Sequence, residues 1–211
     1  MGVFERENSF CFLDWDDTLM FTSVLEEYLD SGDNSMPDEA LVEKLAILDK
    51  SVARLLIKIA GQSNVMIVSN AEMSWIDFSC SKFFPSVKRV LAAYDIDVLS
   101  ARDTFSDEFK EHPEDWKAQM FCREVSRRSK APGAKLNIVV VGDDVVDILA
   151  AERLGNLLPY ATVKAVKFTK DPTVDQLLRQ ISLFNIQFPR VHSWPRSTVV
   201  SVPEACTAHG A

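Results

Sequence analysis

The sequence predicts an α/β fold, a Rossmann-like parallel sheet of about five strands with helices on both faces. The first observation behind this prediction is that five short apolar segments alternate with segments of helical periodicity. The second is the size of the chain, because 211 residues with 47% apolar and 26% charged side chains can bury one core without disulfides. We therefore expect one α/β domain over residues 1–187.

Five apolar segments are the predicted strands of this sheet. They cover residues 10–14, 65–69, 96–99, 138–141 and 162–168, and the third is the weakest. Strands that alternate with helices are typical of a parallel sheet that is covered on both faces. In such sheets, ligands bind at the carboxyl ends of the strands. The residues that follow each predicted strand are therefore the first candidates for a functional site.

Helical periodicity is clearest between the first two strands. Six apolar side chains recur there at spacings of three and four, namely Leu41, Leu45, Leu48, Val52, Leu55 and Ile59. A helix packed on the sheet explains this stripe better than a coiled-coil seam does. Further helices are predicted at residues 75–84, 113–128, 145–154 and 172–183. Residues 188–211 contain Pro, Ser and scattered Val without periodicity, so we expect an irregular tail there.

Charge and composition narrow the classes of partner. With 23 basic and 31 acidic side chains the formal charge is -8, which gives no basic surface for nucleic acid or anionic membranes. No apolar run reaches the roughly 18 residues that span a bilayer, and the amino terminus has no signal pattern. We expect a cytoplasmic protein, with the nucleus as the second candidate compartment, that has no nucleic-acid or membrane partner. The sequence does not indicate an oligomer.

Six carboxylates crowd the ends of the first and fourth predicted strands. They are Asp14, Asp16 and Asp17 after the first strand, and Asp143, Asp144 and Asp147 after the fourth. If these strands are neighbours, the like charges repel one another and need a positive partner. Hard oxygen ligands in a rigid arrangement suit Mg²⁺, which also coordinates phosphate. The sequence therefore predicts a Mg²⁺ site at this edge of the sheet.

The pair Asp14-x-Asp16 is a weak signal when it is taken alone. The same pattern is found in nucleotide-sugar transferases and in solvated acidic turns. A calcium loop is excluded, because Leu19 stands where that loop needs Gly and Leu25 stands where it needs Glu. The second predicted strand strengthens the signal, because Ser69 and Asn70 follow it and supply a hydroxyl and an amide for an anionic oxygen.

Together, these segments resemble the motifs of the haloacid dehalogenase superfamily of phosphotransferases. Asp14-x-Asp16-x-Thr18-Leu19 is similar to its first motif, Ser69-Asn70 to its second, and Gly142-Asp143-x-x-x-Asp147 to its fourth, in the same order. The resemblance covers roughly residues 8–185. It implies that Asp14 is the nucleophile that takes the phosphoryl group. It also implies that Asp16 is the general acid for the leaving oxygen and then the base for water.

The resemblance assigns the other site residues as well. Ser69 would be catalytic, and Thr18 and Asn70 would bind the substrate. The family's third motif is a lysine that neutralises the nucleophile and the phosphate. Lys117 at the start of a predicted helix fits this motif best, and Lys110, Lys130 and Lys135 are its competitors.

The same resemblance implies the metal ligands. Asp143 would bind Mg²⁺ together with Asp14 and Asp16, while Asp147 or Asp144 would complete the shell or hold its waters and Lys117. An alternative role for Asp147 is to cap the helix that follows. The side chains of Trp15 and Asp17 alternate with these residues, so both are expected to face away from the site as structural residues.

Many members of this family cover their site with an inserted cap domain, for which this chain has little room. Residues 19–38 suffice for a short flap, and a predicted helix and strand fill the interval from Asn70 to Lys117. Arg102 and Asp103 follow the third strand, where a surface ion pair is a better interpretation than contact with a leaving group. The resemblance implies that such an open site accompanies macromolecular substrates, or oligomers in which a neighbouring subunit supplies a lid.

We therefore expect a Mg²⁺-dependent phosphatase that hydrolyses a phosphomonoester, such as a phosphoprotein, through an aspartyl phosphate. Two alternatives stay open. One is a catalytically weak member of the same fold that serves as a metal-binding or interaction module. The other is a nucleotide-sugar transferase that uses Asp14-x-Asp16 to bind its metal.

Overall fold

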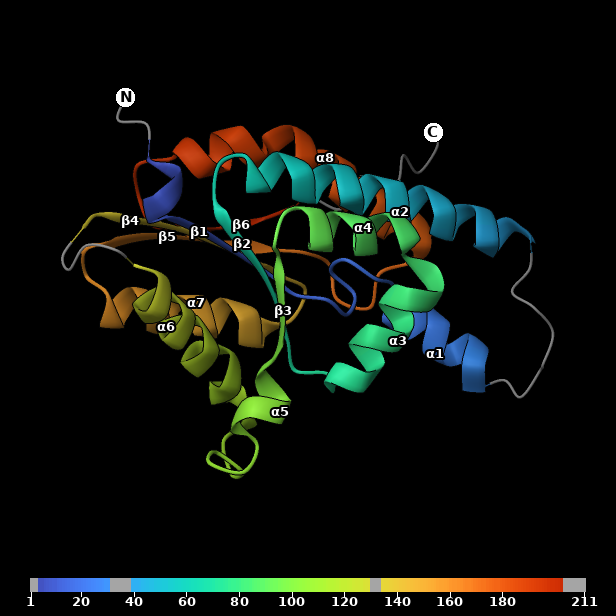
Figure 1. Cartoon of the computed structure of the whole chain (residues 1–211), viewed down its shortest axis with the longest axis horizontal. Helices are drawn as coiled ribbons and strands as arrows, with labels where there is room; N and C mark the ends of the chain where they lie inside the picture. The colour runs from blue at the N-terminus through green and yellow to red at the C-terminus, as the bar shows by residue number, and fades with distance from the viewer. Residues whose placement is uncertain (1–3, 31–38, 130–133, 203–211) are drawn as a thin grey trace, which may run out of the picture.

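The computed structural model describes residues 4–30, 39–129 and 134–202, whose six strands form one parallel sheet in the order β3-β2-β1-β4-β5-β6 (Figure 1). The strands are β1 (Ser9–Leu13), β2 (Asn64–Ser69), β3 (Asp97–Ser100), β4 (Leu136–Gly142), β5 (Ala161–Lys167) and β6 (Thr198–Ser201). Leu13 at the end of β1 is in register with Ile67 of β2 and Val141 of β4. The predicted α/β fold is confirmed, and the strands that precede the acidic segments are neighbours.

Both faces of the sheet are covered by helices. Alternate residues of a strand point to opposite faces, so Cys11 and Leu13 pack with one layer and Phe10 and Phe12 with the other. The first layer contains α2 (Glu39–Ala60), α4 (Pro85–Ala93) and α8 (Val174–Ser193). The second contains α5 (Ala101–Phe105), α6 (Trp116–Arg128) and α7 (Val145–Leu157). Figure 1 shows the two layers above and below the sheet.

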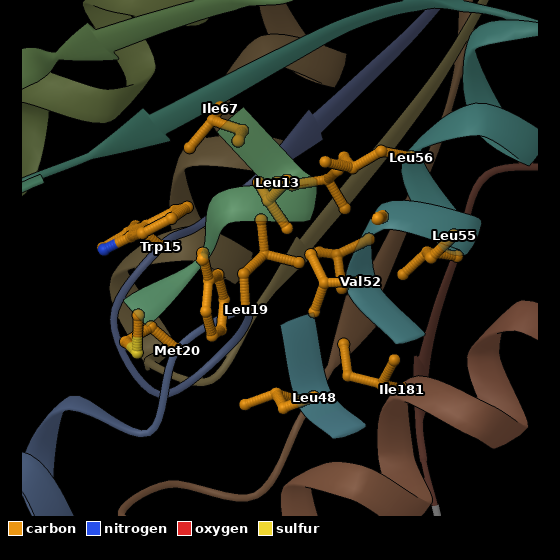
Figure 2. Close-up of a cluster of buried hydrophobic side chains, with 14 of the residues drawn as sticks. Leu13, Trp15, Leu19, Met20, Leu48, Val52, Leu55, Leu56, Ile67 and Ile181 are labelled. Atoms are coloured by element: carbon orange, nitrogen blue, oxygen red, sulfur yellow. The ribbon is translucent and has the colours of Figure 1, made fainter. Parts of the chain in front are cut away.

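The apolar stripe predicted for residues 41–59 forms the inner face of α2. Leu48, Val52 and Leu55 have no exposed surface. Figure 2 shows them beside Leu13 and Ile67 of the sheet and Ile181 of α8. The same cluster includes three side chains of the loop after β1, namely Trp15, Leu19 and Met20. The core therefore fixes the loop that carries the first acidic segment.

The carboxyl-terminal part of the chain differs from the prediction. Residues 188–211 were expected to be irregular, but α8 continues to Ser193 and Thr198–Ser201 adds a sixth strand beside β5. The buried face of α8 continues through Phe184, Phe188 and His192. The helix also contains Pro189, a residue that usually breaks a helix. Strand β6 has only four residues, three of them exposed, and its sequence shows no alternation of apolar and polar residues that would predict a strand. Residues 203–211 lie outside the described residues.

Three helices are absent from the sequence prediction, and the shortest of them is α5 (Ala101–Phe105). Helix α1 (Thr22–Asp30) lies in the expected flap, of which residues 31–38 are outside the described residues. Helix α4 follows α3 (Met73–Phe83), and the carboxylate of Asp49 in α2 accepts hydrogen bonds from the backbone N–H groups of Ser86 and Val87 in its first turn. The cap from Asp49 comes from a distant part of the chain, so the only local signal for the start of α4 is Pro85 at its first position.

The interval between the second strand and the predicted lysine holds no inserted domain among its residues, all of which are described. It contains α3, α4, β3, α5 and a 3-10 turn at Pro113–Asp115, and another such turn at Arg6–Asn8 precedes β1. None of the helices in the described ranges is long and apolar enough to cross a membrane.

Candidate active site

The carboxyl ends of β1 and β4 bring three carboxylates to one point. The backbone N–H of Asp14 donates to the carbonyl of Val141 at 2.9 Å, which ties the end of β1 to β4. Asp143 directly follows β4, and Asp147 is the third residue of α7. One carboxylate oxygen from each of Asp14, Asp143 and Asp147 lies within 4.8 Å of the other two, and all three residues are buried. We call this group the carboxylate cluster.

Lys117 is inserted between two members of the carboxylate cluster. As the second residue of α6, it places its Nζ 2.8 Å from Oδ1 of Asp14 and 2.6 Å from Oδ1 of Asp147. Burial alone would lower the pKa of Lys117, but the charges of the two carboxylates more than offset this and raise it. The competitors Lys110 and Lys135 are exposed, and Lys130 lies outside the described residues.

The carboxylate cluster carries more negative charge than Lys117 can neutralise. Burial raises the pKa of Asp14 well above its usual value, although the charge of Lys117 opposes the shift. Burial and the charges of Asp147 and Asp17 raise the pKa of Asp143 to about 7. A divalent cation would supply the missing positive charge, and a donor set made of carboxylate oxygens fits a hard cation.

This excess charge predicts a pH dependence of stability. The pKa of Asp143 is raised in the folded state, so between about pH 4 and pH 7 the folded chain binds a proton that the unfolded chain has released. The free energy of unfolding of the metal-free protein should therefore fall as the pH rises through this window, by up to about 4 kcal/mol. Above pH 7 the favourable contribution of this proton is lost.

A bound cation should reverse this loss. Because protons and the cation compete for the same oxygens, the rise in Tm caused by Mg²⁺ should be larger at about pH 8 than at about pH 5. Thermal unfolding at both pH values, with EDTA as the baseline, measures the difference. An equal or smaller rise at the higher pH would contradict a cation site in the carboxylate cluster.

The position of Asp147 depends on the glycine that precedes Asp143. A Cβ atom added to Gly142 would lie 2.1 Å from Cγ and 2.5 Å from Cβ of Asp147. The Asp147 carboxylate is also held at both oxygens, because Oδ1 accepts from Lys117 and Oδ2 accepts from the backbone N–H of Asp144. The close approach of Asp147 to the strand therefore requires glycine at this position.

Gly142→Ala should displace Asp147, and Lys117 with it. We expect the affinity for Mg²⁺ to fall about tenfold or more and the free energy of unfolding to fall by about 1–3 kcal/mol. Calorimetric titration and thermal unfolding measure the two effects. Gly61→Ala is the matched control, since the nearest atom to its added Cβ would be the carbonyl oxygen of Lys58 at 3.5 Å. If Gly142→Ala binds Mg²⁺ as tightly as the wild type does, the close packing of Asp147 against residue 142 does not support the carboxylate cluster.

Asp16 is held apart from the carboxylate cluster by three side-chain donors. Its Oδ1 accepts from Oγ1 of Thr22 at 2.6 Å and from Nε1 of Trp75 at 2.9 Å. Its Oδ2 accepts from Oγ of Ser69 at 3.0 Å. The side chain of Asp16 is therefore not among the carboxylates that meet at the possible metal position, although the sequence prediction included it with the metal ligands.

Asp144 also differs from the metal-ligand prediction. Its Oδ1 accepts from the backbone N–H of Val146 and caps α7, while its Oδ2 lies 2.8 Å from Nζ of Lys170. The hydrogen bond from Lys170 lowers the pKa of Asp144. Asp147 belongs to the same capping box, so it both serves the helix and contacts Lys117. The two roles proposed for Asp147 are thus compatible.

The predicted substrate-binding residues lie in different places. Thr18 is fully buried and donates from Oγ1 to Oδ1 of Asp143 at 3.2 Å, so it supports the cluster and is not part of the cavity lining. Ser69 and Asn70 do line the cavity. In the described part of the chain, Oδ1 of Asn70 is buried and has no hydrogen-bond partner.

A cavity of about 720 Å³ lies over these groups. Besides the residues discussed above, its lining includes several that sequence reasoning did not assign, namely Thr22, Ser23, Glu26, Glu72, Trp75, Lys170 and Asp171. Arg102 also lines it and lies 3.8 Å from Glu72, while Asp103 instead accepts from the backbone N–H of Met73. The expected Arg102–Asp103 ion pair is therefore replaced by contacts of each residue with the start of α3.

Trp15 and Asp17, which were both expected to face away from the site, point in different directions. Trp15 points into the core, as alternation predicts, and donates from Nε1 to Oγ of Ser79 at 3.0 Å. Asp17 was expected to face away from the site, but it lines the cavity. Its φ of 49° is left-handed, which turns its carboxylate toward the backbone N–H and the hydroxyl of Ser23 in α1. Asp17 thereby joins the loop to α1.

Comparison of the chain with protein-family models, with curated proteins and with solved structures finds no match. The described residues form a buried carboxylate cluster with an inserted lysine and a separately held Asp16. Asp14, Asp143 and Lys117 line the same cavity as Asp16.

Proposed function

We propose that the chain is a Mg²⁺-dependent phosphatase that hydrolyses a phosphomonoester by carrying the phosphoryl group on Asp14. The observation that supports this most strongly is the carboxylate cluster with its inserted lysine, of which Asp14, Asp143 and Lys117 line the same cavity as Asp16. Phosphoryl transfer depends on alignment and on neutralisation of charge. A nucleophile, a cationic side chain, a place for a metal and a separate acid–base group are together the parts that this reaction needs.

Asp14 is the nucleophile in this proposal. Within the described residues, Nζ of Lys117 and the backbone N–H of Trp15 both contact its Oδ1, at 2.8 Å each. Its Oδ2 is then the oxygen that attacks phosphorus. A bond forms between Oδ2 and phosphorus while the bond from phosphorus to the leaving oxygen breaks, and Asp16 donates its proton to that oxygen.

The second step regenerates the enzyme. Asp16, now ionised, takes a proton from a water molecule as the water oxygen attacks the phosphoryl group on Asp14. The bond between Asp14 and phosphorus breaks, inorganic phosphate leaves, and both carboxyl groups return to their starting states. One carboxyl group thus serves as acid and then as base, which fits the separate set of donors that holds Asp16.

Asp14 and Asp143 would hold the Mg²⁺ ion, with Asp147 behind them as the partner of Lys117. When bound, the ion neutralises the carboxylate cluster and polarises a phosphate oxygen. Ser69 and Asn70 would bind the phosphate. Asn70 lines the cavity, and its NH₂ group would donate to an anionic oxygen of the phosphate.

We infer a macromolecular substrate such as a phosphoprotein, because no inserted domain covers the cavity within the described residues. The substrate itself then has to exclude water from the site. The cavity lining includes Glu26, Glu72 and Asp171, and the chain has a formal charge of -8. Basic residues beside the phosphorylated side chain should therefore favour binding.

Phosphate release from a panel of substrates tests this proposal. The panel contains 4-nitrophenyl phosphate and phosphopeptides with basic or acidic flanks, each assayed with Mg²⁺ and with EDTA. We expect Mg²⁺-dependent release, faster for basic flanks, and a phosphorylated Asp14 peptide after acid quenching. Mg²⁺ binding without release from any substrate would favour the interaction module. Hydrolysis of sugar nucleotides alone would favour the transferase.

A further inference from the structure

We propose that Trp75 is a positioning residue for the acid–base step, because its indole N–H holds the carboxylate of Asp16. This role rests on the proposed phosphatase function. Nε1 of Trp75 donates to Oδ1 of Asp16 at 2.9 Å, and the same oxygen accepts from Oγ1 of Thr22 at 2.6 Å. Both Trp75 and Thr22 line the cavity.

The three donors to Asp16 come from three different elements. Trp75 is the third residue of α3, Thr22 is the first residue of α1, and Ser69 is the last residue of β2. A carboxylate offers about four acceptor positions, so these donors fill all but one. The position that is left belongs to Oδ2, which accepts only from Ser69 among the described contacts. This oxygen is therefore the one that can exchange a proton with a leaving oxygen or with water.

Trp75 is itself held on a rigid support. Its ring lies 6.0 Å from that of Phe78, centroid to centroid, and it packs against the core. The start of α3 is tied to α5 by the hydrogen bond from the Met73 N–H to Asp103 at 2.8 Å. Further along, Ser79 accepts from the indole of Trp15, next to Asp16 in the chain. The contact with Trp15 thus ties α3 to the loop that carries Asp16, and the contact with Asp103 ties α3 to α5, as a positioning residue requires.

Trp75→Phe keeps an aromatic ring beside Phe78 and removes the donor to Asp16. Release of the leaving group in a single turnover isolates the step in which Asp16 donates a proton. We expect the rate for an alkyl phosphate, glycerol 2-phosphate, to fall about tenfold to a hundredfold. The rate for 4-nitrophenyl phosphate should fall less than about threefold, because a good leaving group needs little protonation. The apparent KM should stay nearly constant.

Two further variants complete the test. Thr22→Val removes the other donor to Oδ1 and should change the ratio of the two rates in the same direction. Trp116→Phe is the matched control, because Nε1 of Trp116 donates at 3.0 Å to the carbonyl of Phe109, away from the cavity lining. It should leave the ratio unchanged. If Trp75→Phe lowers the rates for both substrates equally, or lowers neither, the positioning role of Trp75 is overturned. The proposed phosphatase function is not affected by that result.

A readout that does not need turnover separates this role from the proposed function. In ¹H–¹⁵N spectra, the indole proton of Trp75 should exchange slowly with solvent in the wild type and faster in Asp16→Ala. An unchanged exchange rate would overturn the hydrogen bond and the positioning role with it. If the wild-type protein releases neither leaving group, the phosphatase proposal is overturned. The positioning role of Trp75 then falls with it, even if the exchange rates show the hydrogen bond between Trp75 and Asp16.

Discussion

Replacement of Asp14 by Asn is expected to lower phosphate release by more than about 10³-fold without loss of the fold. The amide has the shape of the carboxylate, and its oxygen can still accept from Lys117 and from the backbone N–H of Trp15. It cannot form the acyl phosphate. Burial raises the pKa of Asp14, so removal of this charge should leave the Tm of the metal-free protein equal or higher.

Phosphate release, Mg²⁺ titration and thermal unfolding of Asp14→Asn check the three parts of this expectation. Asp49→Asn is a matched control, because Asp49 is also buried but accepts from the backbone N–H groups of α4 instead of lining the cavity. Activity of Asp14→Asn within about tenfold of the wild type would exclude Asp14 as the nucleophile. A marked loss of Tm in the metal-free variant would show that Asp14 stabilises the fold as an anion.

Lys117→Met is expected to cause the largest loss of stability. The variant leaves the carboxylate cluster buried without its cation, and the loss of one partner from a buried ion pair costs about 3–5 kcal/mol. The loss should be greatest above about pH 7 and smaller at about pH 5, because the orphaned carboxylates can then take up protons. Phosphate release should fall as well, since the variant removes the side-chain cation that contacts Asp14.

Chemical unfolding at the two pH values measures the effect of Lys117→Met. Lys44→Met is the matched control, since Lys44 pairs with Asp175 at 3.1 Å on the surface, where such a pair contributes less than about 1 kcal/mol. If both variants lose the same small amount of stability, Lys117 does not neutralise the carboxylate cluster. If the loss from Lys117→Met does not depend on pH, the carboxylates are not the groups that it leaves unpaired.

The carboxylate cluster could be predicted because its signals are local. Asp14 and Asp143 each follow a buried strand, and Asp147 comes one helical turn later. The sequence did not establish that these residues lie close together. The structure shows that they do, because β1 lies beside β4. Lys117 was less certain, because many lysines precede the fourth strand and only the packing of α6 selects one of them.

The support of Asp16 could not be predicted in the same way. Trp75 lies 59 positions from Asp16, and its indole reaches the carboxylate because of how α3 docks on the loop after β1. Thr22 is closer in sequence, but its contact depends on α1, where the sequence indicated only a flap. Strand β6 was missed for a related reason, since its four largely exposed residues form a strand by pairing with β5 and show no apolar pattern of their own.

We propose that Asp14 and Asp143 bind a single divalent cation next to Lys117. An anomalous difference map from crystals grown with Mn²⁺ in place of Mg²⁺ would locate this cation. We predict one strong peak bonded to a carboxylate oxygen of each aspartate, with Nζ of Lys117 still in contact with Oδ1 of Asp14. A strong peak elsewhere and none at this position, or no peak at saturating Mn²⁺, would contradict the claim.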